Sequence, residues 1–441
     1  MQCRKTAIAA CAAFVLSAAS FAQTQKWVTT YEGPAPGQDA DEGRAVEYVD
    51  GSVYTAGYGG NASGVRSMTA LSFTQEGTTR WTFVLAGSNF SEAYDVAVGG
   101  GNAYLAGFTT GSATGKDFSV ATVDAATGTL VSLFSYNSGS ADEAVAVAFG
   151  EDGDVYACGQ TTQGSMNQWT VMRLHVDVPT GQTTQVWSAP YIMSGIFGSY
   201  AYDIVYGGDN KIYTCGQNPN SEFTVVCLNK DTGSEIWRYE NPTFFGAAYS
   251  VIFGGDGKVY ACGHTQIGVF TVVKLDPPSG NQIWLFAEQY GLARTLVYGN
   301  DTNIYVAGYD TQTSSGSTDL AVMKIDRLSG TKVWDRYVDG SSQITDEAFS
   351  IAYGRDGGVY AAGYFQNPAI LGGNPQRDFV VVAYWNDGTP KWSSPYKYGD
   401  LNNSDTANGI VRGQFGNVYA VGVSFQPGNA SDFTVVNLGT E

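Results

Sequence analysis

Residues 254–263 read GGDGKVYACG, a Gly/Asp turn followed by a short apolar strand that carries one tyrosine and ends in glycine. The pattern Tyr-x-(Ala/Cys/Val)-Gly, preceded by an apolar strand and such a turn, occurs eight times. Its tyrosines are Tyr54, Tyr104, Tyr156, Tyr213, Tyr260, Tyr305, Tyr360 and Tyr419, spaced by 45 to 59 residues. This period matches the length of one propeller blade, so the chain is predicted to be a repeat protein.

Each repeat reads as four strands. Residues 144–148, 155–158, 432–436 and 334–337 are examples of strands one to four, and they are rich in β-branched and aromatic residues with period-2 alternation. The turns between strands one and two and between strands three and four contain Gly and Asp, which tolerate positive φ. The sequence therefore predicts an all-β protein of four-stranded antiparallel blades.

The two ends of the chain complement each other. The eighth repeat stops after its third strand, at residues 435–438, and the missing fourth strand is present as residues 27–31. Pairing of the N-terminal strand with the C-terminal blade would close the ring and remove the open sheet edges. The prediction is a single eight-bladed β-propeller over residues 24–441.

The turn before the fourth strand carries a family resemblance. LNKDTGSEIW at residues 228–237 resembles the tryptophan-docking repeat of pyrroloquinoline-quinone-type propellers, and its Gly-x-x-x-Trp spacing recurs at 77–81, 280–284, 330–334 and 388–392. Trp27 takes this position in the closing blade, and Ser132 takes it in blade two. The Asp-Gly…Val-Tyr-x-Ala-Gly half resembles repeats of bacterial exported β-propeller proteins. The resemblance implies the fold, and it implies a quinoprotein oxidoreductase only as one alternative.

The first residues and the net charge bear on location and partners. Arg4 and Lys5, the apolar run 6–19 and the small residues before Gln23 predict a signal peptide at residues 1–22 and an exported protein, periplasmic or extracellular. The formal net charge of −18 argues against nucleic acid or an anionic membrane as a partner. The sequence has no second apolar stretch that would predict a membrane span. We expect the protein to be a monomer.

One face of the predicted disc varies more than the other. The loops between strands two and three and the blade-to-blade connections differ in length and composition, as residues 263–269 and 364–377 illustrate. The other turns are short and nearly uniform. Because variable loops on a rigid frame usually carry binding, the varied face is the candidate functional face.

A first ring of candidate ligand-binding residues follows the strand-two glycine of each repeat. Its aromatic and amide side chains suit a sugar or a peptide. The alternative is that the aromatic rings only cover blade edges. The ring consists of Tyr58, Phe108, Gln160, Gln217, His264, Tyr309 and Tyr364, with Val423 in the last repeat.

A second ring lies where strand one begins. Glu42, Glu92, Glu143 and Glu347 occupy this position, with Asp405 less well aligned, and blades four to six have Tyr200, Ala247 and Leu292 instead. Carboxylates crowded at the mouth of the channel would suit calcium. The alternative is ordinary solvation at the start of a strand.

The four cysteines after residue 22 are expected to fill small buried spaces. Cys158, Cys215 and Cys262 stand where other repeats have Ala or Val. Only Cys215 and Cys227, on adjacent strands of one blade, are placed where a disulfide is feasible. With His175 and His264 as the two histidines, a zinc site is not expected.

No catalytic constellation is found in the sequence. It has no Gly-x-Ser-x-Gly motif and no adjacent cysteines of the kind that quinoprotein dehydrogenases use. We therefore expect an exported, non-catalytic propeller that binds a protein or glycan through its varied loop face. A glycan-binding propeller and a quinoprotein-type oxidoreductase using pyrroloquinoline quinone and calcium are the alternatives. No cofactor is expected, and calcium is the ion to test.

Overall fold

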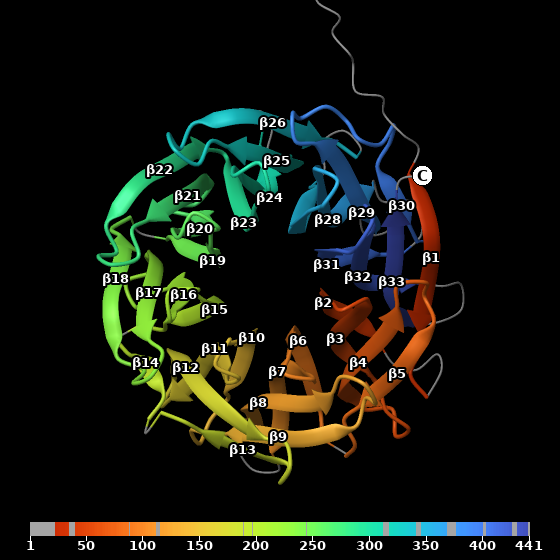
Figure 1. Cartoon of the computed structure of the whole chain (residues 1–441), viewed down its shortest axis with the longest axis vertical. Coiled ribbons are helices and arrows are strands. Elements are labelled where there is room, and N and C mark those ends of the chain that lie inside the picture. Colours follow the sequence, from red (N-terminus) through yellow and green to blue (C-terminus); the bar gives the residue numbers. More distant parts are fainter. Residues whose placement is uncertain are drawn as a thin grey trace, which may run out of the picture.

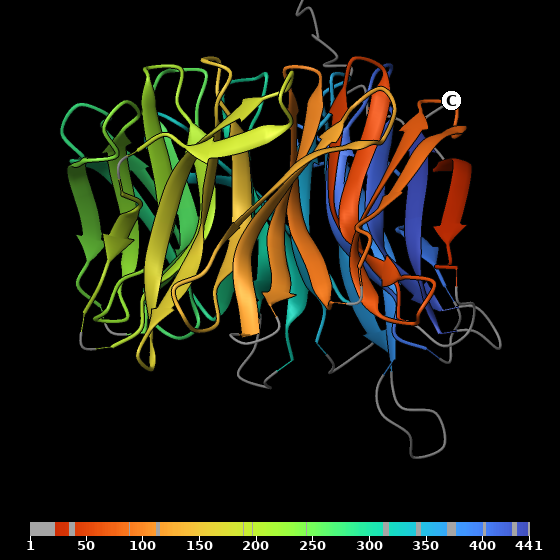
Figure 2. The same ribbon diagram turned by 90° about the horizontal axis from the view of Figure 1, so that it is seen from below.

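The computed structural model describes residues 23–34, 40–87, 89–111, 115–187, 189–195, 197–243, 245–311, 317–340, 345–367, 376–399, 403–425 and 430–439. All regular elements in these ranges are β-strands, and they form eight antiparallel sheets. The sheets are arranged as blades around a central axis (Figure 1). In side view the molecule is a disc (Figure 2). The predicted signal peptide at residues 1–22 lies outside the described residues. Within the described ranges there is no helix that would be long and apolar enough to span a membrane.

Blades are numbered along the chain from β2. Blade 1 contains β2 (Glu42–Val49), β3 (Ser52–Gly60), β4 (Arg66–Thr74) and β5 (Thr79–Val84), and blade 2 contains β6 (Ser91–Gly99), β7 (Asn102–Gly111), β8 (Gly115–Asp124) and β9 (Leu130–Tyr136). Blade 3 contains β10 (Glu143–Phe149), β11 (Val155–Gln163), β12 (Met166–Asp177), β13 (Gln182–Gln185) and β14 (Tyr191–Met193). Blade 4 contains β15 (Tyr200–Tyr206), β16 (Lys211–Gln217), β17 (Phe223–Asn229) and β18 (Glu235–Asn241).

Blade 5 contains β19 (Ala247–Phe253), β20 (Val259–His264), β21 (Val269–Leu275) and β22 (Gln282–Gln289), and blade 6 contains β23 (Gly291–Tyr298), β24 (Ile304–Asp310), β25 (Asp319–Ile325) and β26 (Lys332–Val338). Blade 7 contains β27 (Glu347–Tyr353), β28 (Gly358–Asn367), β29 (Gln376–Trp385) and β30 (Tyr396–Tyr398). Blade 8 contains β31 (Thr406–Arg412), β32 (Val418–Phe425), β33 (Ser431–Gly439) and β1 (Thr24–Tyr31). In every blade the first strand is nearest the axis (Figure 1).

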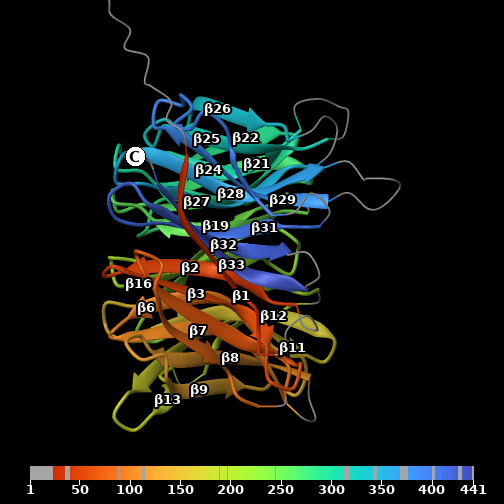
Figure 3. The same ribbon diagram turned by 90° about the vertical axis from the view of Figure 1, so that its right-hand side faces the viewer.

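The ring is closed by the two ends of the chain. The sheet of blade 8 has the order β1-β33-β32-β31. The N-terminal strand β1 pairs antiparallel with β33, with Val28 opposite Val436 and Thr29 opposite Val435. Figure 3 shows these two strands side by side. The predicted closure is confirmed.

The repeated tyrosines and tryptophans pack together. All eight tyrosines of the pattern are buried. Seven of them contact the tryptophan of their own blade, with ring centroids 5.5 to 6.1 Å apart, as Tyr260 and Trp284 do at 5.9 Å. The pair forms part of the apolar core between two blades.

The tryptophans also join each blade to the next. The indole N–H of Trp237 in blade 4 donates to the carbonyl oxygen of Pro277 in blade 5 at 2.6 Å. A side chain at Gly280, which has φ +70°, would collide with the indole ring. Trp27, Trp81, Trp187, Trp284 and Trp334 dock on the following blade in the same way. In blade 2, Ser132 takes the place of the tryptophan, and its hydroxyl forms a hydrogen bond with the hydroxyl of Thr183 in blade 3.

Trp392 of blade 7 is the exception. Its indole nitrogen is buried and has no hydrogen-bond partner in the described chain. In blade 8 the third and fourth strands come from opposite ends of the described chain, so there is no turn between them to supply the carbonyl group.

The four cysteines that follow the predicted signal peptide are free and buried. Cys158, Cys215 and Cys262 lie in the apolar clusters between blades, as expected for small filler residues. Cys215 and Cys227 are not bonded to each other. Burial raises the pKa of the Cys227 thiol to about 12, so this cysteine is an unreactive thiol near neutral pH.

The missing acceptor at Trp392 leads to a testable difference in stability. Trp237→Phe removes an indole N–H and leaves the Pro277 carbonyl without its donor, whereas Trp392→Phe removes no hydrogen bond. Because the loss of ring area is the same, Trp237→Phe is expected to lower the free energy of unfolding by about 1 kcal/mol more than Trp392→Phe. Urea denaturation of both variants measures this, and equal losses would contradict the docking role of the hydrogen bond.

Candidate functional site

The two predicted rings form one structure. In each blade the residue after the strand-two glycine lies directly opposite the first residue of strand one, or the second residue in blades 2 and 6. The pairs are Glu42–Tyr58, Glu92–Phe108, Glu143–Gln160, Tyr200–Gln217, Ala247–His264, Leu292–Tyr309, Glu347–Tyr364 and Thr406–Val423. We call this ring of cross-strand pairs the belt. The face of the disc that it borders, where the innermost strands begin, is the loop face.

The register corrects one alignment. Asp405 was expected to be the blade 8 member of the acidic ring, but Thr406 occupies that position, opposite Val423. Asp405 instead matches the aspartates that directly precede the belt, Asp41, Asp142 and Asp346. These aspartates are buried and accept backbone N–H groups. Neighbouring acidic residues such as Asp346 and Glu347 therefore have different roles.

A set of functional candidates not found from the sequence lies two residues beyond the belt. Every innermost strand has a β-bulge there, and the bulged residues are Arg44, Tyr94, Val145, Tyr202, Tyr249, Arg294, Phe349 and Asn408. A bulge bends the strand and redirects a side chain. The only signal in the sequence is a constant offset of two residues from the belt position.

The bulge residues explain the four belt glutamates. Each glutamate is bound by the bulge residue of the preceding blade. Arg44 pairs with Glu92 at 2.8 Å, and the Tyr94 hydroxyl donates to Glu143 at 3.2 Å. Arg294 pairs with Glu347 at 2.5 Å, and the Asn408 amide donates to Glu42 at 3.0 Å. These carboxylates thus tie neighbouring blades together, and we call them the charged arc.

Three aromatic members of the first ring belong to the same arc. Tyr58, Phe108 and Tyr364 are buried. Cationic side chains cover their rings, with Arg66 4.6 Å from the Tyr58 centroid, Lys116 4.0 Å from that of Phe108, and Arg377 4.0 Å from that of Tyr364. Gln160 donates to Glu143. This side of the belt therefore presents charged groups rather than open ring faces.

Blades 4 to 6 have a different surface. Here Tyr200, Tyr202, Tyr249, His264 and Tyr309 are half-buried and form what we call the aromatic arc. Ring centroids are 5.3 Å apart for Tyr202 and Tyr249, and 5.4 Å apart for Tyr249 and His264. Gln217 donates to the Gly246 carbonyl beside it.

In the aromatic arc, the pKa shifts of Tyr249, Tyr309 and His264 all favour the uncharged form of the side chain. Burial raises the pKa of Tyr249 and Tyr309. Burial, together with the positive charge of Arg294, lowers the pKa of His264. Arg294, whose guanidinium carbon lies 5.1 Å from the Tyr249 centroid, stands at the end of the arc and is paired with Glu347.

Four exposed apolar residues lie on the loop face in segments that adjoin the strands of this arc. They lie in the connections that precede β15, β19 and β23 and in the loop between β20 and β21. Their exposed fractions are 62% for Phe197, 61% for Phe245, 80% for Ile267 and 62% for Tyr290. Phe245 and Tyr290 have φ of 65° and 75°, a conformation that bulky residues rarely adopt and that often marks a functional site. We call these four residues the apolar rim.

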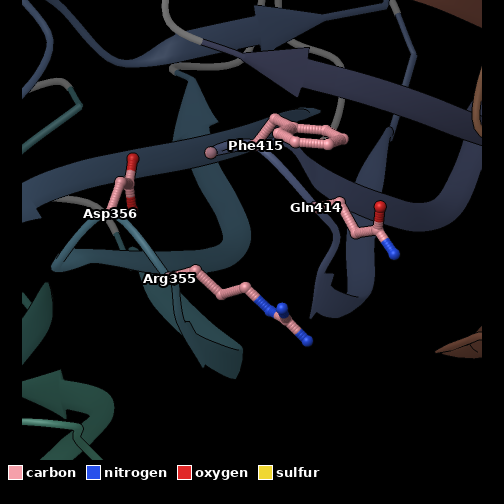
Figure 4. A pocket seen from close by; sticks show the side chains of 5 residues that line it. Arg355, Asp356, Gln414 and Phe415 are labelled. Atoms are coloured by element: carbon pink, nitrogen blue, oxygen red, sulfur yellow. The ribbon is translucent and has the colours of Figure 1, made fainter.

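The opposite face of the disc has shallow cavities. One of about 410 Å³ is lined by the ends of innermost strands in blades 4 to 8, with Val205, Ile252 and Val297 among its residues. Another of about 430 Å³ lies between the turns of blades 7 and 8, where Figure 4 shows Arg355 and Asp356 on one turn and Gln414 and Phe415 on the other. Phe415 is 82% exposed, isolated from the apolar rim, and serves below as a control position.

Acidic residues also gather at the rim between blades 6 and 7. Carboxylate oxygens of Asp319, Asp339 and Asp346 lie within 4.8 Å of one another, the only such group of three within the described ranges. Burial and the charges of the other two raise the pKa of Asp346 to about 6. None of the belt glutamates belongs to this group.

The geometry defines a closed eight-bladed β-propeller, and its repeats are similar to the pyrroloquinoline-quinone-like type. The family model described as outer membrane protein assembly factor BamB matches residues 174–392. No curated protein sequence matches the chain significantly.

Solved propellers share the fold at low sequence identity. A quinohemoprotein alcohol dehydrogenase from Pseudomonas putida HK5 is 12% identical, with 95% of this chain and 76% of that chain covered and a TM-score of 0.57. A europium-containing methanol dehydrogenase is 12% identical, with 95% and 93% covered and a TM-score of 0.59. The Dos1 propeller is 9% identical, with 95% of both chains covered and a TM-score of 0.59.

A quinone with calcium, as the resemblance implied, fits the belt poorly. Calcium takes roughly six to eight oxygen ligands. Each belt glutamate already binds the bulge residue of a neighbouring blade, and the four lie in four different blades. The cysteines are buried in the cores of blades 3, 4 and 5, and the two in blade 4, Cys215 and Cys227, are not adjacent in the sequence. We derive no redox step from these residues.

Two carboxyls deeper in the innermost strands make stability depend on pH. Burial, with the nearby charge of Asp95, raises the pKa of Glu47 to about 8, and burial raises that of Asp95 to about 7. The folded state therefore holds these protons more tightly than the unfolded state does.

The contribution of these two protonated carboxyls to the free energy of unfolding is fully present below their ordinary pKa values of 4.5 and 3.8. It is lost as the pH rises through about 7 for Asp95 and about 8 for Glu47. Glu47→Gln is expected to flatten this decline, whereas Glu151→Gln at an exposed position should leave it unchanged. The urea midpoint measured from pH 5 to pH 9 is the test. A decline of equal slope in Glu47→Gln would show that Glu47 is not its source.

Proposed function

We propose that the protein is an exported, non-catalytic propeller that binds an apolar or aromatic segment of a partner protein on its loop face. The site is the aromatic arc of blades 4 to 6 together with the apolar rim. The observation that carries the proposal is the position of Phe197, Phe245, Ile267 and Tyr290, which are all exposed on one face beside uncharged aromatic side chains. Large apolar side chains exposed together on one face of a protein are a mark of a binding site.

The contrast with the rest of the belt supports this location. In blades 1, 2, 3 and 7 the glutamates are taken up by contacts between blades. In blades 4 to 6 the equivalent positions are Tyr200, Ala247 and Leu292, so the aromatic groups there are not engaged in such ties. Tyrosine faces supply large contact area at little entropic cost and are enriched in binding interfaces.

A glycan is the second candidate ligand. Half-buried tyrosine rings beside His264 and Gln217 would allow sugar stacking and hydrogen bonding. The exposed aliphatic side chain of Ile267 favours a protein segment instead, because sugars gain little from aliphatic contact. Export rests on the signal-peptide pattern of residues 1–22, and a monomer is sufficient for this mode of binding.

The proposal is tested by screening the mature protein against a displayed peptide library and a glycan array. Tyr249→Ala and Ile267→Ser are expected to weaken binding of the recovered ligands at least about tenfold, which corresponds to roughly 1.4 kcal/mol. Phe415→Ser, on the opposite face, should bind as the unchanged protein does.

Recovery of peptides alone would support a protein partner, and recovery of glycans alone would favour the second candidate. Ligands that bind all three variants equally would show that the site lies elsewhere. A quinone that bound at the belt and supported alcohol oxidation would replace the binding role with an oxidoreductase.

A further inference from the structure

The innermost strands of blades 4 to 8 end around one of the cavities on the face opposite the loop face, with a volume of about 410 Å³. Its apolar lining includes one residue per blade at the same register, directly opposite the tyrosine of the repeat pattern. These residues are Val205, Ile252, Val297, Ala352 and Val411. Glu47 has this register in blade 1 and does not line the cavity. We call this space the channel-end cavity, and its volume suits a small molecule.

The charged residue of the lining is Arg412, the last residue of β31 in blade 8, and its side chain is exposed. Arg412 occupies a repeat position that has a structural role in most blades. In six blades the residue there is aromatic and contacts the repeat tyrosine of the preceding blade, with ring centroids 5.1 to 6.1 Å apart. Phe253, which contacts Tyr213 at 5.7 Å, is an example.

Arg412 does not take over this role in blade 8. Its guanidinium group forms no ion pair, hydrogen bond or ring contact within the part of the chain that the structure describes, and the same is true of Arg355. Every other arginine in the described ranges has at least one such partner. The fold therefore gives no structural reason for a positive charge at position 412.

Arg355 lies close in the chain to the same cavity. It follows the lining residue Tyr353 by two positions and lines the neighbouring cavity between the turns of blades 7 and 8 (Figure 4). Its neighbour Asp356 is engaged elsewhere, because it pairs with Lys391 at 3.1 Å and accepts the Tyr360 hydroxyl at 3.0 Å. Two arginines without partners thus stand at one end of the disc, in a protein whose formal net charge is −18.

We propose that the channel-end cavity binds a small aliphatic carboxylate. The aliphatic chain lies against the valine and isoleucine side chains of the lining, where it is removed from water. The carboxylate pairs with Arg412, whose planar guanidinium matches a carboxylate through two parallel hydrogen bonds. This site is on the opposite face from the aromatic arc and does not depend on the function proposed for the loop face.

The charge of the lining favours a carboxylate over a phosphate. A phosphate monoester carries nearly two negative charges and is usually bound by clusters of arginines. The lining of the channel-end cavity has Arg412 as its charged residue, which balances the single charge of a carboxylate.

The experiment is calorimetric titration of the mature protein with octanoate and with octanol, which has the same chain without the charge. Octanoate is expected to bind at least about fivefold more tightly than octanol, because of the charge-assisted pair with Arg412. Arg412→Gln is expected to lower the affinity for octanoate to that for octanol. Lys26→Gln removes the same charge from an exposed position on the outermost strand β1 and should keep the preference for octanoate.

A second variant tests the apolar part of the site. Val297→Thr keeps the shape of the side chain and replaces a methyl group with a hydroxyl, so it is expected to weaken binding of both octanoate and octanol about threefold. Circular dichroism spectra confirm that each variant is folded.

Three results would each overturn the proposal. The first is the absence of any heat of binding with octanoate. The second is equal affinity of the unchanged protein for octanoate and octanol. The third is a preference for octanoate that persists in Arg412→Gln.

Discussion

The pairing of β1 with β33 is the constraint on which the rest of the molecule depends. Each blade buries its apolar faces against two neighbours, so the packing is complete only when the first and last blades meet. Main-chain hydrogen bonds between the two ends of the chain close that gap. The tryptophan docking runs from blade to blade around the ring, with Ser132 in place of the tryptophan in blade 2. Among the docking tryptophans of the described chain, Trp392, beside the closing blade, is the one without an acceptor.

Closure also places the functional features. Every innermost strand has a bulge at the same level, and in blades 1, 2, 6 and 8 the bulged residue contacts the next blade. Where that contact is a salt bridge or hydrogen bond to a glutamate, the belt stabilises the disc. Where blades 4 to 6 have replaced the glutamate, tyrosines are left half-buried, and exposed apolar residues lie in adjoining segments of the loop face. The same repeat position thus joins neighbouring blades in one arc and, in the proposed function, binds a partner in the other.

The expectations from the sequence differ in outcome for physical reasons. The closing strand, the role of Trp27 and of Ser132, and the buried cysteines are confirmed, because each depends only on position within a repeat. The bulge residues, such as Arg44 and Arg294, were not found, because a one-residue bulge redirects side chains without changing the pattern of residue types. Asp405 was misaligned by one residue for the related reason that strand register is not visible in spacing alone.

The sequence by itself determined the number of blades, their four-stranded form and the closure by the two ends, since periodicity and turn chemistry are local and repeat eight times. It also placed the belt residues at equivalent positions. Only the tertiary structure decided that two rings are one belt, that Tyr58, Phe108 and Tyr364 lie under cations, and that Phe197, Phe245, Ile267 and Tyr290 share a face. These facts depend on contacts between blades, which residues far apart in the sequence make only after the ring has closed.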